Sequence, residues 1–395
     1  MKQDWYYKQF DNPIEQPQEV LDLLAAPLTE SDEIKIWPET GVRGFNCQPI
    51  ATIAQNKENP GMYLTHKNFR RLKEFGVNSL RLMIRPDEDC LWNGSDYKKK
   101  KNFLPPVPKD DPMAPYHKHL EAMKVALQLA EQYDMYIIPS GDGVVGRGID
   151  IYYKESDGSG YAQAYFDLWM EIVKRYGKHP RLLAYDLMNE PYTDEEKTEY
   201  IDVILPKLIK LIREKDQNTY LIVEPHPFSL PESFSNMLPI NDPKMVYSPH
   251  WYYPHSYTHQ GLGGYPEVCA NYPGMLRNFN DSPLENWDKE RLRKAMQPVR
   301  DFQLKYNAKI WIGEFSVIRW ASGAANWLDD SISLFEEYGW DWACHAYRGW
   351  SLWNPTFRPY VAFTSEDDGG FESDRLKVLM KWFSLNGKER NSLQD

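Results

Sequence analysis

The sequence lacks the features that mark membrane proteins, disulfide scaffolds, zinc proteins and nucleic-acid binders. No run approaches the roughly 18–20 apolar residues that a membrane-spanning helix needs. The four cysteines are too few and too scattered for a disulfide framework, and neither CxxC nor HExxH occurs. Basic residues are in the minority, with 46 Lys and Arg against 57 Asp and Glu, so the formal charge is −11. We therefore expect no metal, no cofactor, no nucleic-acid partner and no membrane partner.

The first ten residues contain no apolar segment of the kind found in a signal peptide. Two localisations follow as alternatives. Either the chain is cytoplasmic, or a signal peptide has been removed from it and the protein is secreted or periplasmic. We expect a monomer.

Aromatic residues, by contrast, are abundant. The 395 residues include 14 Trp, 26 Tyr and 16 Phe, which make up 14% of the chain. Hydrophobic residues reach 42%, enough to build a large core and to exclude disorder. The number of aromatic side chains exceeds what a core alone explains, and we expect part of it to line a binding site.

Eight short runs rich in β-forming residues alternate with longer runs of helical periodicity. The predicted strands cover residues 42–47, 78–84, 135–140, 182–188, 219–224, 244–248, 309–313 and 340–347. The predicted helices cover residues 65–75, 117–133, 161–176, 200–212, 231–237, 288–304, 324–338 and 374–383. This alternation predicts an α/β fold with a parallel sheet, and eight units favour a (β/α)₈ barrel. A doubly wound open sheet is the alternative.

No linker divides the chain, so we expect one barrel domain over residues 41–395. Residues 1–40, with a possible helix at 19–26, are predicted to be an N-terminal extension packed on the barrel. Three long segments follow predicted strands, at residues 85–116, 141–160 and 249–287. In a barrel all three would lie on the C-terminal face, where active sites are built.

Two glutamates stand at the carboxyl ends of predicted strands. Glu190 follows the fourth strand in Asn189-Glu190-Pro191, and Glu314 ends the seventh strand in Gly313-Glu314-Phe315. Side chains at these positions would face each other across the mouth of a barrel. A pair of carboxylates, one protonated and one ionised, is what glycoside hydrolysis requires. Either glutamate alone could equally be a helix cap or a salt-bridge partner.

In these motifs the sequence resembles the glycoside hydrolases of clan A, and family 5, the cellulase family, most closely. Further matches are Arg81 on the second strand and His250 and Tyr252 on the sixth. An aromatic residue after the eighth strand matches Trp350, with Trp353 the second choice. The resemblance implies a (β/α)₈ barrel that hydrolyses β-glycosidic bonds with retention of configuration.

The resemblance also implies roles for these residues. Glu314 would be the nucleophile, kept ionised by Arg81 and by Tyr252, and Glu190 the acid/base. Asn189 would hydrogen-bond the sugar 2-hydroxyl, and His250 would orient Glu190 or a sugar hydroxyl. For Arg81 a salt bridge inside the barrel, and for His250 a core position, remain the simpler alternatives.

One position departs from the family pattern. Many family 5 enzymes have a sugar-binding histidine at the end of the third strand, where this chain has Asp142. We therefore include Asp142 among the candidate substrate-binding residues, which are Arg81, Asp142, Asn189, His250, Tyr252, Trp350 and Trp353. Further aromatic residues expected at the cleft are Trp92, Tyr97, Tyr152, Tyr153, Trp320 and the run from Trp251 to Tyr257.

The resulting prediction is a retaining β-glycosidase resembling an endo-β-1,4-glucanase, with a β-linked polysaccharide or oligosaccharide as substrate. A β-mannanase, another β-glycosidase of the family, and a non-catalytic sugar-binding barrel are the alternatives. The GxGxxG pattern at 141–146 is not followed by a helical sequence, which disfavours a dinucleotide site. The segment 349–353 lacks the final glycine of a serine-hydrolase elbow.

Overall fold

The computed structural model describes residues 15–51, 61–85, 110–111, 113–141, 161–191, 200–262, 264–265, 270–349, 351–359 and 372–390. Two candidate residues, Asp142 and Trp350, lie outside these ranges. The same holds for four of the aromatic residues expected at the cleft: Trp92, Tyr97, Tyr152 and Tyr153. No helix in the described part of the chain is both long enough and apolar enough to cross a membrane.

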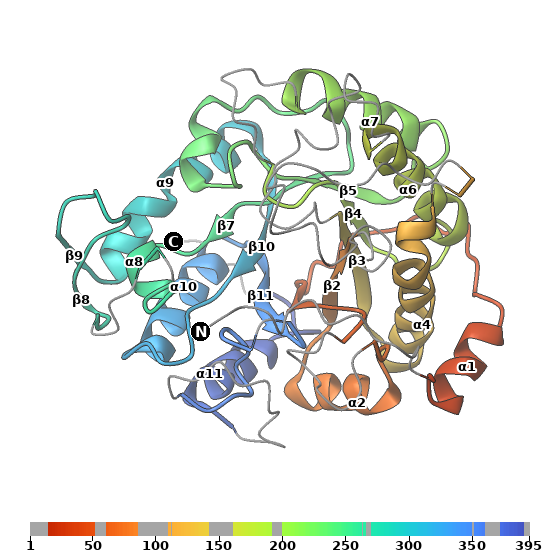
Figure 1. The fold of residues 1–395 in the computed structure, drawn as a ribbon. Coiled ribbons are helices and arrows are strands. Elements are labelled where there is room, and N and C mark those ends of the chain that lie inside the picture. Colours follow the sequence, from red (N-terminus) through yellow and green to blue (C-terminus); the bar gives the residue numbers. More distant parts are fainter. Residues whose placement is uncertain are drawn as a thin grey trace, which may run out of the picture.

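The strands form a closed parallel barrel (Figure 1). They are β1 (Arg43–Cys47), β2 (Ser79–Ile84), β3 (Tyr136–Gly141), β4 (Ala184–Asp186), β5 (Tyr220–Val223), β6 (Met245–Tyr247), β7 (His250–Trp251), β10 (Lys309–Phe315) and β11 (Asp341–Tyr347). Neighbouring strands pair in chain order, and β11 pairs with both β10 and β1, which closes the ring. The predicted (β/α)₈ barrel is therefore confirmed, and the open sheet is excluded.

The sixth barrel position is divided between two short strands. β6 pairs with the start of β10 through Ile310↔Tyr247, and β7 pairs with its end through Glu314↔His250. This pairing sets His250 directly beside Glu314. The register therefore brings two of the predicted site residues together before any side chain is considered.

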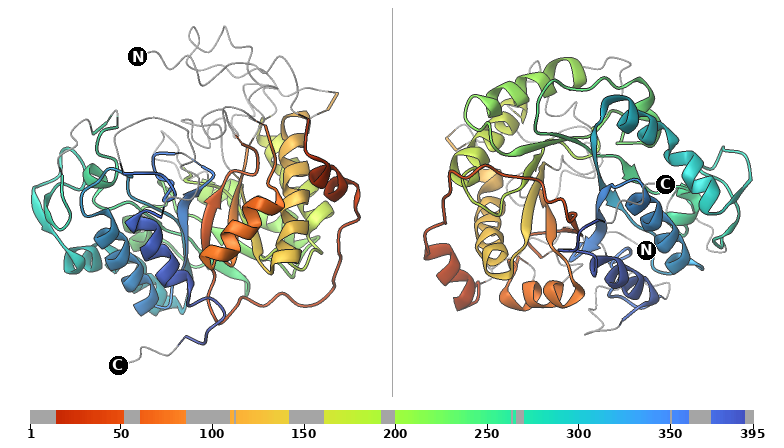
Figure 2. Two further views of the ribbon diagram at one scale, coloured as in Figure 1. Left: turned by 90° about the horizontal axis from the view of Figure 1, so that it is seen from below. Right: turned by 180° about the vertical axis from the view of Figure 1, so that it is seen from behind.

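Helices surround the barrel in both views of Figure 2. The main ones are α2 (His66–Phe75), α4 (His117–Tyr133), α6 (Tyr161–Tyr176), α7 (Leu205–Arg213), α9 (Lys289–Tyr306), α10 (Ala324–Glu337) and α11 (Asp374–Phe383). Shorter elements are a π-helical turn (Tyr200–Ile204), 3₁₀ turns at Ala114–Tyr116 and Pro231–Asn236, α8 (His255–Thr258), and the hairpin of β8 (Gly274–Leu276) and β9 (Glu285–Trp287). The α2 helix begins where Asn68 Oδ1 accepts the Thr65 N–H and ends at Gly76, whose φ of 87° suits glycine.

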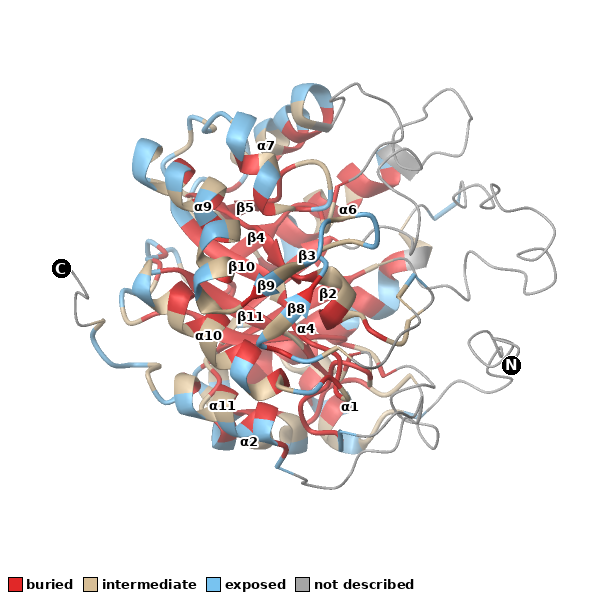
Figure 3. Ribbon diagram, turned by 90° about the vertical axis from the view of Figure 1, so that its left-hand side faces the viewer, coloured by how far each residue is buried: buried red, intermediate tan, exposed pale blue. Residues whose placement is uncertain are grey.

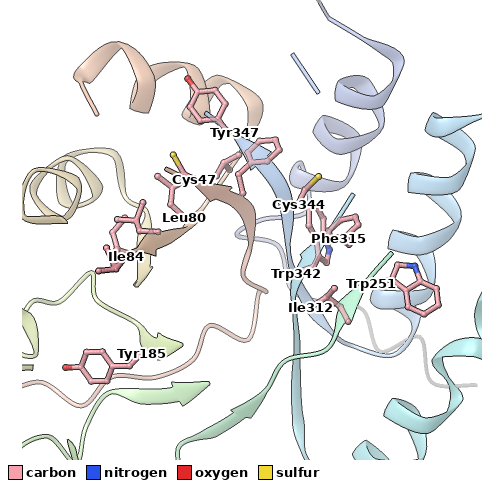
Figure 4. Packing of buried hydrophobic residues seen from close by; sticks show 14 of the residues in the cluster. Cys47, Leu80, Ile84, Tyr185, Trp251, Ile312, Phe315, Trp342, Cys344 and Tyr347 are labelled. Atoms are coloured by element: carbon pink, nitrogen blue, oxygen red, sulfur yellow. The ribbon is translucent and has the colours of Figure 1, made fainter. Parts of the chain in front are cut away.

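Two apolar layers hold the barrel together. Outward-facing side chains fill the space between strands and helices, and Figure 4 shows Phe315, Trp342 and Trp251 among them. Inside the barrel, a second cluster includes Trp37 and Trp311. Figure 3 shows the barrel strands almost wholly buried, while the surrounding helices have exposed residues on their outer faces. This is the pattern expected when each amphipathic helix buries one stripe against the sheet.

The segment before the barrel packs along its side and base. The helix α1 (Gln18–Ala25) lies against α4, and the Lys124 ammonium donates to the Leu24 carbonyl at 2.6 Å. Further along, the Trp37 indole N–H donates to Asp341 at 2.6 Å. Trp37 thus occupies the amino-terminal mouth of the barrel and leaves the opposite mouth for the cleft.

The barrel interior changes from apolar to polar toward the carboxyl ends of its strands. Asn46, Arg81, Ser140, Asp186 and Glu224 occupy this polar level, and each is completely buried. Buried charges are tolerated only when they are paired and hydrogen-bonded. This polar level forms the floor of the cleft above it.

Candidate active site

A cleft of about 430 Å³ opens above the polar floor. It is lined by Gln48, Met83, Arg85, Asn189, Glu190, Phe228, Leu230, His250, Tyr252, His255, His259, Phe279, Glu314, His345 and Trp353. The predicted candidates Glu190, Glu314, Asn189, His250, Tyr252 and Trp353 are thus brought together on one surface. Arg81 lies just beneath it, because its guanidinium contacts both Glu314 and Asn189.

Glu314 ends β10 and points into the cleft with 12% of its side chain exposed. The Tyr252 hydroxyl donates to Oε1 at 2.6 Å, and Arg81 Nη1 donates to Oε2 at 3.2 Å. Burial opposes the charge, but neighbouring basic groups and one hydroxyl stabilise it more strongly, and the pKa of Glu314 is lowered to about 2. These neighbours are His345, His250, Arg81 and Tyr252. Glu314 is therefore ionised at neutral pH and remains so on acidification until the pH approaches 2.

The glycine before Glu314 allows this close packing. A Cβ atom at Gly313 would lie 2.3 Å from the Ser248 hydroxyl oxygen, well inside contact distance. The Gly313 carbonyl also accepts a hydrogen bond from the Asn46 amide at 2.7 Å. A side chain at this position would displace the strand that carries Glu314.

Glu190 follows β4 and lies on the opposite wall of the cleft, with 36% of its side chain exposed. Its backbone has a φ of 44°, and its N–H donates to Glu224 at 2.7 Å. His250 Nδ1 lies 2.8 Å from Glu190 Oε1. Burial, together with the charges of Glu314 and Glu224, raises the pKa of Glu190, although His250 opposes this rise. The two cleft carboxyl groups therefore have pKa values displaced in opposite directions.

Arg81 connects the carboxylates of the floor. Its Nε donates to Asp186 at 2.7 Å and its Nη2 to Glu224 at 2.8 Å. The same Nη2 donates to Asn189 Oδ1 at 2.9 Å. Arg81 thus makes a salt bridge inside the barrel and also contacts the site, so the two interpretations of this residue are compatible. Removing one partner of such a buried network typically costs about 3–5 kcal/mol.

His250 is completely enclosed and lies between two carboxylates. Its Nδ1 faces Glu190, and its Nε2 lies 3.2 Å from Glu224 Oε1. Burial disfavours the charge of His250, but Glu224 and Glu190 outweigh it and raise its pKa to about 10. At neutral pH this histidine is an imidazolium that hydrogen-bonds Glu190 through Nδ1 and forms an ion pair with Glu224 through Nε2.

One wall of the cleft is a series of stacked rings. His255 stacks on His259 at 4.9 Å and on Phe279 at 4.8 Å. Trp353 meets His259 edge-on at 5.4 Å and His345 at 6.0 Å. Burial lowers the pKa of His255 to about 3 and of His259 to about 4, so both rings are neutral above these values. Flat uncharged rings are suitable surfaces for the C–H faces of a sugar.

Several aromatic residues predicted at the cleft lie elsewhere. Trp251 is 2% exposed and donates to Ser331 of α10, outside the barrel. Tyr253 and Tyr257 are also buried in the outer core. The prediction was wrong for these residues. Trp251 and Tyr253 alternate with Tyr252 along an extended segment and therefore face away from the cleft, and Tyr257 lies in α8.

Sequence reasoning missed several polar residues of the site, among them Asn46, Asp186, Glu224 and His345. Each is a polar residue within or at the end of a predicted apolar strand. Glu224 carried the clearest signal, because it precedes a proline at a strand end, as Glu190 does. His345 Nδ1 lies 3.6 Å from Glu314 Oε1, near the end of β11, the strand after which the sequence motif indicated Trp350.

Three donors in the described part of the chain could in principle hold a metal ion. One ligand atom each of Glu190, His250 and Glu314 lies within 4.8 Å of the others. A metal ligand must offer a free lone pair, and an imidazolium protonated on both nitrogens has none. This donor set therefore does not suit a metal ion while His250 carries its charge.

A closed parallel barrel with acidic groups at the carboxyl ends of its strands is an enzyme architecture. The family model "Cellulase (glycosyl hydrolase family 5)" matches residues 38–356. The chain belongs to this family and is a glycosyl hydrolase, as the sequence motifs predicted.

Individual relatives agree with this assignment. Endoglucanase C of Acetivibrio thermocellus is 25% identical over 306 residues, which cover 72% of this chain and 83% of the relative. Cellodextrinase A of Ruminococcus flavefaciens is 25% identical over 240 residues, covering 58% and 68%. The structure of a hyperthermophilic endo-β-1,4-glucanase superposes with a TM-score of 0.64 at 18% identity, over 87% of this chain and 97% of the other.

Proposed function

We propose that this glycosyl hydrolase is a retaining endo-β-1,4-glucanase in which Glu314 is the nucleophile and Glu190 the acid/base. The observation that supports this most directly is the pairing of the two carboxyl groups. They have oxygen atoms within 4.8 Å of each other, and their pKa values are displaced in opposite directions. Retaining enzymes place their carboxyl groups about 5–5.5 Å apart, whereas inverting enzymes leave about 6.5–9.5 Å for a water molecule.

The proposed reaction has two steps. Glu314 attacks the anomeric carbon and forms an ester, the glycosidic C–O bond breaks, and Glu190 gives its proton to the leaving oxygen. In the resting enzyme the negative charge of Glu314 adds to the effect of burial in raising the pKa of Glu190. Esterification removes this charge. The pKa of Glu190 consequently falls, and Glu190 can then take a proton from the water that cleaves the ester.

The substrate assignment rests on the relatives. Both are named for action on cellulose-type chains, one as an endoglucanase and the other as a cellodextrinase. We therefore place a β-1,4-glucan first and short cellodextrins second. The stacked wall of His255, His259, Phe279 and Trp353 offers rings for the sugar faces.

Product stereochemistry tests this proposal. The enzyme is expected to hydrolyse carboxymethylcellulose and cellohexaose, and the first product seen by proton NMR should be the β-anomer. Endo action should lower the viscosity of carboxymethylcellulose faster than reducing ends accumulate. An α-anomer as first product would exclude the double displacement, and activity confined to mannan would exclude the glucan assignment.

The pH dependence of kcat/KM provides a second prediction. Glu314 has a lowered pKa of about 2, so its active ionised form is lost only on acidification toward that value. Glu190 has a raised pKa, so its active protonated form persists above the usual 4.5. A bell-shaped profile is expected, with an alkaline limb above pH 4.5. An alkaline limb at or below 4.5, with the fold intact by circular dichroism, would contradict the assignment of Glu190.

A further inference from the structure

A third carboxylate, Glu224, lies directly beneath the two in the cleft. It follows β5, is completely buried, and is not among the residues that line the cleft. It therefore does not contact substrate. It does contact groups that adjoin both Glu190 and Glu314, and this placement suggests a role in the reaction beyond holding the barrel together.

Both oxygens of Glu224 are fully engaged. Oε2 accepts the Glu190 backbone N–H at 2.7 Å and the Ser229 hydroxyl at 2.6 Å. Oε1 accepts Arg81 Nη2 at 2.8 Å and lies 3.2 Å from His250 Nε2. A carboxyl group surrounded by donors on every side has no room for a proton of its own. Glu224 is consequently a fixed negative charge.

His250 is fixed between this charge and Glu190. With Nε2 held toward Glu224 and Nδ1 toward Glu190 Oε1, the ring has an acceptor on each side. The negative charge of Glu224 beside Nε2 favours a proton on that nitrogen, and a second proton on Nδ1 makes the ring an imidazolium. Its Nδ1 proton then occupies Oε1 of Glu190, and the transferable proton of Glu190 can reside only on Oε2.

We propose that Glu224 is a positioning residue that keeps His250 doubly protonated and thereby directs the acid proton of Glu190 to Oε2. The same carboxylate, through the Glu190 N–H, fixes the backbone of the acid at its φ of 44°. This inference rests on the proposed function in one respect, the role of Glu190 as the acid. The link between Glu224 and the charge of His250 stands independently of it.

Other charged groups also face these residues. Those around Glu224 are Arg81, Asp186, Glu190 and His250. Those around His250 are Glu190, Glu224, Glu314 and His345. Asp186 supplies a matched control, because it is an equally buried carboxylate whose ion-pair partner, at 2.7 Å, is Arg81 and not His250.

The test is nitrogen NMR of the imidazole ring in protein labelled with ¹⁵N-histidine, with His250 assigned by its loss in His250→Asn. In the unmodified enzyme both ring nitrogens should remain protonated through pH 8. In Glu224→Gln the midpoint of the His250 titration should fall by at least about two pH units. A change of this size is what a neighbouring opposite charge typically makes to a pKa. In Asp186→Asn it should stay above pH 8.

Three results would overturn the proposal. They are a His250 ring that titrates near 6.5 in the unmodified enzyme, an unchanged midpoint in Glu224→Gln, and an equal fall in both variants. The first of these results needs only the unmodified enzyme, so the proposal can be overturned even if Glu224→Gln does not fold.

Kinetics complete the test. In Glu224→Gln, kcat/KM for cellotetraose should gain a pH-dependent limb at the new His250 midpoint. A displaced midpoint with an unchanged pH profile would overturn the positioning role. A failure of the proposed function gives a different result. Glu314→Gln would then retain activity, while the NMR titration would still report whether Glu224 sets the charge of His250.

Discussion

Replacing Glu314 by glutamine is expected to abolish hydrolysis, with kcat falling on the order of 10⁴- to 10⁶-fold, as when other enzymes lose their nucleophile. The amide keeps the shape of the side chain but cannot form the glycosyl ester. The amide oxygen can keep the hydrogen bond from Tyr252, while the NH₂ group replaces the oxygen that accepts from Arg81, so we expect a folded protein with a lowered unfolding midpoint. The measurement is the rate of cellotetraose hydrolysis, together with the thermal unfolding midpoint.

The control is Glu290→Gln. Glu290 lies on α9 with 70% of its side chain exposed, and its loss should leave the rate unchanged. Mass spectrometry after incubation with a 2-deoxy-2-fluoro cellobioside should detect a covalent adduct on Glu314 in the unmodified enzyme. Near-normal turnover by Glu314→Gln, or an adduct on another residue, would show that the nucleophile has been misassigned.

The second large effect is expected at Glu190, and it depends on the leaving group. In Glu190→Gln, kcat/KM for cellotetraose should fall by about 10²- to 10⁴-fold, the usual contribution of a general acid. Formation of the glycosyl ester from 2,4-dinitrophenyl β-cellobioside needs no proton, and its rate should change little. Pre-steady-state release of dinitrophenol measures that step directly.

A burst of dinitrophenol followed by slow turnover is therefore the signature of a missing acid/base, because hydrolysis of the ester still needs Glu190. Equal losses on both substrates would contradict this role and would indicate general damage to the site. His250→Asn serves as a comparison, since it removes the partner of Glu190 Oε1 while leaving the carboxyl group in place.

The fold was predictable because its signals are local. Alternation of apolar residues defined the strands, and features such as Thr65 and Gly76 defined the ends of α2. The split of the sixth position into β6 and β7 was not predictable, because it depends on how both pieces pair with β10. Residues 244–248 and 250–252 gave no sequence sign of two separate pairings.

The sequence predicted the site residues that belong to a recognisable motif, such as Glu190 and Glu314. It was less informative for residues that reach the site only through the alignment of neighbouring strands. Asp186 is adjacent to Arg81 only because β2, β3 and β4 align at their carboxyl ends. Glu224 reaches His250 in the same way, across the β5–β6 pairing and its continuation into β7. A polar residue in an apolar strand signals a buried partner, but the partner's identity follows from three-dimensional alignment.

The divided sixth position separates two properties of the enzyme. Backbone pairing sets His250 beside Glu314, the proposed nucleophile, and it involves no residue of the stacked wall. The wall begins at His255, beyond β7, and is supported by Phe279 from the segment after α8. We therefore expect substitutions between His255 and Phe279 to change substrate preference while the barrel strands keep the spacing of the two carboxyl groups unchanged.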